Sequence, residues 1–157
     1  MTIPTANFLS YNSTGVSDDK CNFINDLCEE NDIHFVSIQE HFKICKTIDK
    51  YFSREFPKYS SYVVPAFRHK GQDSGRPKAG LAQLNKKNLD ISKSRIDSNS
   101  YRVQAQLISF PTNELLWINV YFPTDPLTVD FDDMGLNSVL NSIDNIVEKS
   151  SCKKSFN

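Results

Sequence analysis

In the first forty residues of the chain, two short apolar runs lie on either side of one amphipathic segment. Residues 6–11 and 34–39 are compact apolar runs of the kind that form strands. Between them, Ser17 followed by two acidic residues is typical of a helix start. The apolar residues that follow fall on one helical face: Phe23, Ile24, Leu27 and Cys28. We therefore expect a strand–helix–strand unit.

The middle of the chain continues this alternation. Residues 47–56 predict a short helix that ends before Pro57. Residues 59–67 are rich in aromatic and β-branched side chains and predict a strand. Residues 68–78 are polar, with two glycines and a proline, and predict a loop. A short strand is expected over residues 79–84.

The second half of the chain predicts a hairpin followed by a helix. Residues 101–110 alternate between an apolar side and a side with Arg102, Gln104 and Gln106, so we expect a half-buried strand. Residues 115–122 are apolar on both faces and predict a central strand, antiparallel to the first. Residues 132–149 carry apolar residues at near-helical spacing and predict an amphipathic helix.

Composition limits the classes of function. The net charge of −1 means that any nucleic acid contact must come from a local basic patch. No apolar run approaches the ~20 residues that span a bilayer, and the N-terminus lacks the pattern of a secretory signal. We expect a nuclear or cytoplasmic protein that is not secreted and does not contact a membrane. Its cysteines are then free thiols: Cys21, Cys28, Cys45 and Cys152.

Three polar residues come at the ends of predicted strands: Asn12, Glu40 and Tyr121. In α/β folds the loops past strand ends carry the chemistry. A carboxylate such as Glu40 suits Mg²⁺, which takes one or two protein carboxylates with waters and substrate phosphate. The Asn12 amide could assist at the metal or a phosphate, and Tyr121 could donate a hydrogen bond to a phosphate oxygen. Taken singly, each residue also has an explanation without a functional role. Glu40 could be a solvated glutamate, Asn12 a turn residue and Tyr121 a packed aromatic side chain.

A basic loop lies between the second and third of these positions. Arg76 and Lys78 flank a proline beside two glycines, and Arg68 extends the cationic stretch upstream. These side chains could contact backbone phosphates, although a solvated turn has the same composition. Phe67 offers a possible surface for base stacking, with core packing as the alternative.

The histidines and cysteines do not form a zinc pattern. Cys21, Cys28, His34 and His41 lack the close CxxC or HxxxH pairs that structural zinc sites use. His34 is expected to be structural, and His41 could support Glu40 as its neighbour.

Four segments together resemble a known family. They are Ser-Tyr-Asn-Ser-Thr-Gly at 10–15, Ile-Gln-Glu-His at 38–41, Gly-Arg-Pro-Lys-Ala-Gly-Leu-Ala at 75–82, and Trp-Ile-Asn-Val-Tyr-Phe-Pro-Thr-Asp-Pro at 117–126. The chain resembles the endonuclease/exonuclease/phosphatase superfamily, and specifically the N-terminal portion of the apurinic-like endonuclease of non-LTR (LINE-type) retrotransposons. The resemblance implies an α/β fold, the N-terminal part of a DNase I-like four-layer sandwich with an incomplete second sheet. The domain would cover residues 6–149, with a tail over 150–157.

The resemblance also implies roles for particular residues. The position of Glu40 binds a divalent metal, Mg²⁺ or Mn²⁺, and that of Asn12 helps to bind the metal or phosphate. The position of Tyr121 contacts the scissile phosphate, while Arg76, Lys78 and Arg68 would contact DNA. The implied reaction is hydrolysis of a DNA phosphodiester by an activated water. In retroelements this nick primes reverse transcription, so a reverse transcriptase domain in the parent polyprotein is an expected partner.

The sequence departs from the family pattern in one respect. In the family a Gly-Asp-x-Asn motif activates and positions the nucleophile and an Asp-His pair supplies the general base, and neither occurs in this sequence. We therefore expect the fragment alone to be catalytically inactive. Two alternatives stay open: a phosphatase or phosphodiesterase of the same superfamily, and a non-catalytic remnant or interaction module.

Overall fold

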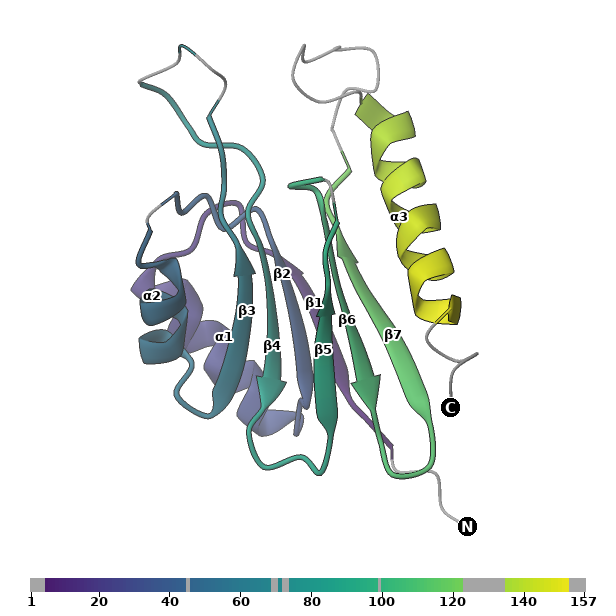
Figure 1. The fold of residues 1–157 in the computed structure, drawn as a ribbon. Helices are drawn as coiled ribbons and strands as arrows, with labels where there is room; N and C mark the ends of the chain where they lie inside the picture. Colours follow the sequence, from purple (N-terminus) through teal and green to yellow (C-terminus); the bar gives the residue numbers. More distant parts are fainter. Residues whose placement is uncertain are drawn as a thin grey trace.

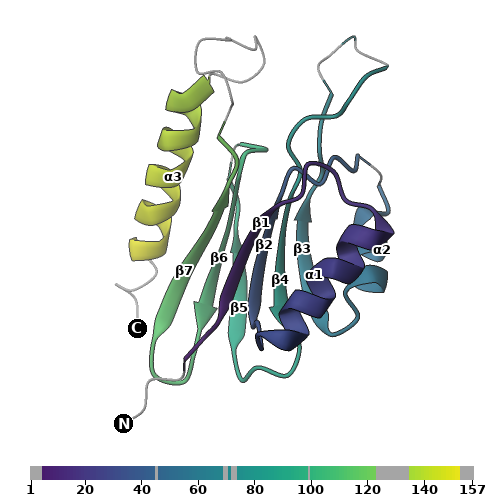
Figure 2. The same cartoon turned by 180° about the vertical axis from the view of Figure 1, so that it is seen from behind.

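The protein is built as four layers, two helices, two sheets and a third helix (Figures 1 and 2). The computed structural model describes residues 5–44, 46–68, 71, 74–98, 100–122 and 135–152. Helices α1 (Asp18–Glu30) and α2 (Ile48–Glu55) cover one sheet, and helix α3 (Gly135–Cys152) covers the other. Within the described part of the chain, no helix is both long and apolar enough to cross a bilayer.

The first sheet contains the predicted strand–helix–strand unit. Its strands are β1 (Phe8–Asn12), β2 (Phe35–Gln39), β3 (Tyr59–Val64) and β4 (Leu81–Lys86), arranged in the order β1-β2-β4-β3. Strand β1 runs parallel to β2, and β4 is antiparallel to both of its neighbours. This arrangement brings the ends of β1 and β2, where Asn12 and Glu40 lie, to the same edge of the sheet.

The second sheet contains the predicted antiparallel hairpin and one strand more. Its strands are β5 (Ser92–Ile96), β6 (Val103–Ser109) and β7 (Glu114–Val120), in the order β5-β6-β7. Strand β5 escapes sequence prediction because Ile96 is its single apolar residue. The expectation that residues 115–122 form a central strand is wrong for the described strands, since β6 occupies the centre and β7 an edge.

Helix α1 buries a narrower stripe than the sequence pattern predicts. The Ser17 side chain accepts a hydrogen bond from the Lys20 amide at its start. The buried residues follow i, i+3, i+7 spacing: Cys21, Ile24 and Cys28. Phe23 is 50% exposed, and its ring meets that of Tyr11 on the edge strand β1. Cys21 and Cys28 are free thiols, as expected, while the side chains of Cys45 and Cys152 lie outside the described residues.

Helix α3 covers the apolar face of the second sheet. Val139 and Ile146 pack on Val103, Ala105 and Leu107, which alternate along β6. The helix continues to Cys152, past the predicted boundary at residue 149. Its predicted first residues lie outside the described part of the chain.

The interface between the two sheets is polar at its centre. Strand β6 was expected to be half-buried, but Gln104 and Gln106 are 1% and 2% exposed, because they face the first sheet rather than solvent. Gln106 donates to the Gln83 side chain at 3.0 Å, and Gln83 donates to the Trp117 carbonyl at 3.0 Å. These amides find partners in the facing sheet, which removes the cost of burying them.

Asn119 of β7 is the most connected member of this interface. Its amide nitrogen donates to the carbonyls of Ile38 and Ala82, both at 3.2 Å, and to Gln104 Oε1 at 3.3 Å. Its amide oxygen accepts a hydrogen bond from Gln39 Nε2 at 2.6 Å. One side chain of the second sheet therefore bonds two strands of the first.

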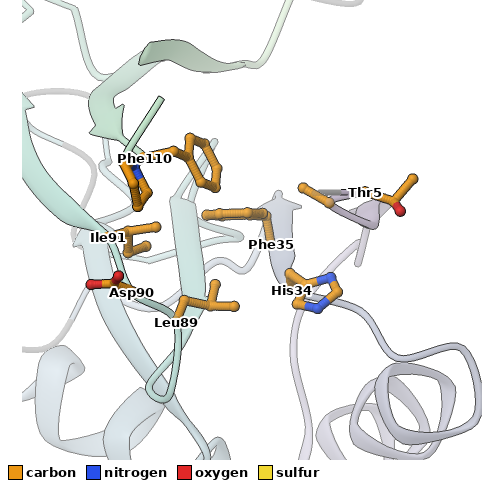
Figure 3. A pocket seen from close by; sticks show the side chains of 9 residues that line it. Thr5, His34, Phe35, Leu89, Asp90, Ile91 and Phe110 are labelled. Carbon is orange, nitrogen blue, oxygen red and sulfur yellow. The ribbon is translucent and has the colours of Figure 1, made fainter. Parts of the chain in front are cut away.

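The opposite end of the interface is apolar. Phe35, Ile108 and Trp117 form a buried cluster there, with Phe35 and Trp117 in an edge contact at 5.5 Å between ring centroids. A cavity of about 260 Å³ opens beside Phe35, and His34 and Asp90 contribute to its lining (Figure 3). Phe35 begins β2, whereas Glu40 follows its end, so the cavity and the predicted site lie at opposite ends of the sandwich.

We predict that Asn119→Ala lowers the free energy of unfolding by about 2–4 kcal/mol, because it leaves buried amide and carbonyl groups without partners. Urea denaturation followed by circular dichroism measures the change. Asn113→Ala, at the exposed β6–β7 turn, is the matched control and should stay within about 0.5 kcal/mol of the parent. Equal effects of the two substitutions would show that the inter-sheet bonds are dispensable.

Candidate functional site

Glu40 lies directly after β2 in a tight and strained loop. Its φ of 56° falls in the left-handed region, where a residue with a side chain costs about 1–2 kcal/mol. Its carbonyl accepts hydrogen bonds from the Gly15 amide at 2.6 Å and from Ser13 Oγ at 3.1 Å. The loop after β1 therefore fixes the backbone of Glu40, which is itself only 9% exposed.

Tyr121 brings the second sheet to Glu40. Its phenol lies close enough to the Glu40 carboxylate and the Arg102 guanidinium for both groups to act on its pKa. Burial and the nearby charge of Glu40 raise the pKa of the phenol above its ordinary value, and Arg102 offsets part of the rise. Tyr121 therefore stays protonated at neutral pH and remains a hydrogen-bond donor.

Arg102 is the member of the site that sequence reasoning missed. It is 4% exposed, and its guanidinium lies 5.3 Å from the centre of the Tyr121 ring and 5.9 Å from that of Phe67. Its backbone carbonyl accepts the Tyr121 amide at 2.9 Å. Its alternation with Gln104 and Gln106 is the signal that could have found it, because all three share the inner face of the sheet.

Asn12 is exposed at the end of β1, opposite Gln39 of β2. Its side-chain oxygen accepts the amide of Thr14 at 3.1 Å, so it shapes the turn that follows. The parallel pairing puts Asn12 one register position from Glu40 on the neighbouring strand.

The basic loop reaches the same edge through Arg76. Its guanidinium donates to the Thr14 carbonyl at 3.1 Å and stacks on the ring of Phe42 at 4.1 Å. Arg68 donates to the carbonyl of Gly75 at 3.2 Å. Lys78 pairs through its backbone with Phe67, and all three cationic residues are exposed.

His41 is buried and structural. Its Nδ1 accepts the amide of Lys43 at 3.0 Å, so Nε2 carries the proton and donates to the Val64 carbonyl at 3.1 Å. Burial lowers the pKa of the imidazole from 6.5 to about 4, so the ring is neutral at pH 7. Gly80 has a φ of +92°, and a Cβ built there would lie 2.6 Å from His41 Cε1. The ring thus fixes the turn beyond Glu40 against the start of β4.

The oxygen donors at this edge are of the kind that Mg²⁺ prefers. Among the described residues, no three histidine, cysteine or acidic side chains gather into a metal-binding group. Mg²⁺ can be held by a single carboxylate together with waters and phosphate oxygens. Glu40, directly after β2, and Asn12, at the end of β1, carry oxygen donors of this kind.

Comparisons in sequence and in structure give different results. No protein-family model and no curated protein matches the chain. Several solved structures are similar, including the following three. An AP endonuclease, LMAP, from Leishmania major has a TM-score of 0.62 and 17% identity, over 92% of this chain and 47% of that one. The endonuclease domain of TRAS1, a telomere-specific non-LTR retrotransposon, has a TM-score of 0.56 and 15% identity, over 93% and 55%. The human Nocturnin catalytic domain, with bound sulfate, has a TM-score of 0.51 and 15% identity, over 87% and 56%.

The three similar structures share one architecture. All belong to the DNase I-like endonuclease/exonuclease/phosphatase superfamily, which confirms the fold expected from the sequence motifs. The chain spans about half the length of each structure that it matches. At this level of identity the likeness shows the fold alone, an incomplete DNase I-like sandwich.

We predict that Gly80→Ala lowers the free energy of unfolding by more than about 3 kcal/mol, because the added methyl group meets the His41 ring in a buried turn. Gly71→Ala is the matched control. Gly71 has a similar φ of +88°, but a Cβ there meets nothing within 4 Å, so we expect only the strain of about 1–2 kcal/mol. Thermal and urea denaturation compare the two, and equal losses would argue against the contact with His41.

We also predict that stability falls as the pH falls from about 6.5 to about 4. In this window the unfolded chain protonates His41 and the folded chain does not, so stability decreases by up to ~1.4 kcal/mol per pH unit. Urea denaturation at pH 7 and pH 5 measures this dependence, which His41→Gln should reduce. Nitrogen-15 NMR should find the His41 ring neutral at pH 5.5. A ring that titrates near pH 6.5 would contradict the assignment.

Proposed function

We propose that this chain forms the metal- and phosphate-binding part of a Mg²⁺-dependent DNA endonuclease site of the retrotransposon type. The observation that carries the proposal is the closeness of Tyr121 to Glu40, which places a hydrogen-bond donor for phosphate from one sheet beside a candidate metal-binding carboxylate from the other. The basic loop with Arg76, beside Asn12, supports DNA as the substrate. The AP endonuclease and the retrotransposon endonuclease domain among the similar structures support the reaction class.

Each residue then has a distinct role. Glu40 and Asn12 would hold Mg²⁺ or Mn²⁺, which when bound supplies charge neutralisation at the scissile phosphate. The protonated phenol of Tyr121 donates a hydrogen bond to a non-bridging phosphate oxygen and orients the group. Arg102, whose guanidinium lies 5.3 Å from the centre of the Tyr121 ring, helps to keep that phenol in place. Arg76, with Lys78 and Arg68 in the same loop, contacts phosphates along the strand.

Hydrolysis also needs a base that takes a proton from the attacking water. His41 is the histidine nearest to Glu40 in sequence, but hydrogen bonds within the protein engage both of its ring nitrogens. In the family that this chain resembles, an Asp-His pair supplies the base and a Gly-Asp-x-Asn motif positions the nucleophile, and this sequence contains neither. We therefore propose that this chain by itself binds metal and DNA but does not hydrolyse the phosphodiester. A reverse transcriptase domain in the same polyprotein is the partner that a retrotransposon origin would supply.

Terbium luminescence tests the metal site without relying on activity. Tb³⁺ binds hard oxygen ligands and is excited through a nearby tyrosine, here Tyr121. We expect sensitised emission that Mg²⁺ and Mn²⁺ displace, and we expect Glu40→Gln to weaken Tb³⁺ binding by at least ~10-fold. The same variant should lose the metal dependence of DNA binding.

Glu30→Gln is the matched control for this experiment, because Glu30 is an exposed acid at the end of α1. It should leave the emission unchanged. Emission that survives Glu40→Gln, or that falls equally with Glu30→Gln, would show that the ion binds elsewhere and would refute the proposed site.

A further inference from the structure

Two aromatic rings from different sheets meet beside the proposed site. Phe67 follows β3, and Tyr101 precedes β6, at the end of the sandwich where Glu40 and Tyr121 lie. Their ring centroids are 5.0 Å apart, with the planes inclined by 34°. Phe67 is half-buried, whereas Tyr101 is 53% exposed. Phe67 therefore supports a ring that presents much of its surface to solvent.

This aromatic pair is linked to the phosphate-binding residues by a continuous series of contacts. Arg102 lies between them, with its guanidinium near the rings of Phe67 and Tyr121 at 5.9 Å and 5.3 Å. Tyr121 in turn lies beside Glu40, which acts on the pKa of its phenol. The exposed ring of Tyr101 thus stands next to the place where a strand would be held by its phosphate, not at a random point on the surface.

An exposed ring on a fixed aromatic support is suited to one kind of ligand at this place. Nucleobases stack on aromatic side chains whatever their identity, and such stacking contributes substantially to the binding of single strands. Bases in a duplex are already stacked on their neighbours and do not offer their faces. We propose that Tyr101, supported by Phe67, is a stacking platform for an unpaired nucleobase next to the bound phosphate.

This inference rests on the proposed function and narrows its substrate class. A site that contacts only phosphates would bind single-stranded and double-stranded DNA with affinities set by their charge. A site with the platform favours strands with an unpaired base, such as single-stranded, frayed or bulged DNA. In this arrangement Phe67 does not stack on the base itself, as its sequence context suggested, but supports the ring that does.

Fluorescence anisotropy with a labelled 12-nucleotide DNA, single-stranded or annealed to its complement, tests the platform. We expect tighter binding of the single strand. Tyr101→Ala should weaken that binding by about 5- to 150-fold and leave duplex binding nearly unchanged. Tyr101→Trp should retain binding, and its fluorescence should be quenched by the single strand, because the other tryptophan, Trp117, is only 8% exposed. The same measurement with a single-stranded RNA of the same sequence shows whether the protein binds DNA or RNA more tightly. Weaker binding of either single strand by the Tyr101→Ala variant supports the platform.

Phe23→Ala is the matched control, because Phe23 is 50% exposed and also contacts another ring, but from helix α1. It should not change single-strand binding. Equal losses for Tyr101→Ala on single strands and duplex, or no loss at all, would overturn the platform. The terbium experiment separates the two proposals. If Glu40→Gln abolishes the Tb³⁺ emission but Tyr101→Ala leaves single-strand binding unchanged, the platform alone is rejected. Tyr101-dependent binding without any effect of Glu40→Gln on Tb³⁺ rejects the metal site alone.

Discussion

The hydrogen bond between Gln39 and Asn119 is the interaction on which the site depends. Gln39 immediately precedes Glu40 in the first sheet, and Asn119 lies two residues before Tyr121 in the second. Their 2.6 Å bond therefore fixes the relative position of two strand ends that carry the two central groups of the site. Asn119 also bonds Ile38 and Ala82, so the same side chain positions β7 against both β2 and β4. Without this register, Tyr121 would not reach the carboxylate.

A polar interface specifies register more sharply than an apolar one. Leucine and isoleucine tolerate sliding by small amounts, but a buried amide that loses its partner costs about 1–3 kcal/mol. The glutamines of β6 are arranged so that each finds a donor or acceptor on the first sheet, whereas the apolar cluster around Phe35 lies at the other end. The strained loop of Glu40 is held in the same way, by bonds from Ser13 and Gly15 and by the packed ring of His41. These bonds hold the Glu40 loop and the neighbouring strand ends rigidly at one end of the sandwich.

Sequence patterns predicted the order of most elements because periodicity reports burial. The β1–α1–β2 unit, the β6–β7 hairpin and helix α3 follow from apolar spacing. Strand β5 did not, because Ile96 alone carries an apolar signal there. Arg102, Gln104 and Gln106 were assigned to a solvent face because polarity usually means exposure, and only tertiary pairing buries them. The positions of Glu40, Asn12 and Tyr121 past strand ends were predictable, but the contact between Tyr121 and Glu40 depends on how the two sheets pack. No local pattern encodes that packing.

We propose that residues from both sheets converge on one metal- and phosphate-binding edge. Paramagnetic broadening of backbone amide signals by Mn²⁺, measured by nitrogen-15 NMR, can locate that edge. We expect broadening to begin together at Asn12, Glu40 and Tyr121 as Mn²⁺ is added, with the cavity end near Phe35 unaffected. Broadening confined to a single sheet, or to the exposed acidic residues of α1, would contradict it.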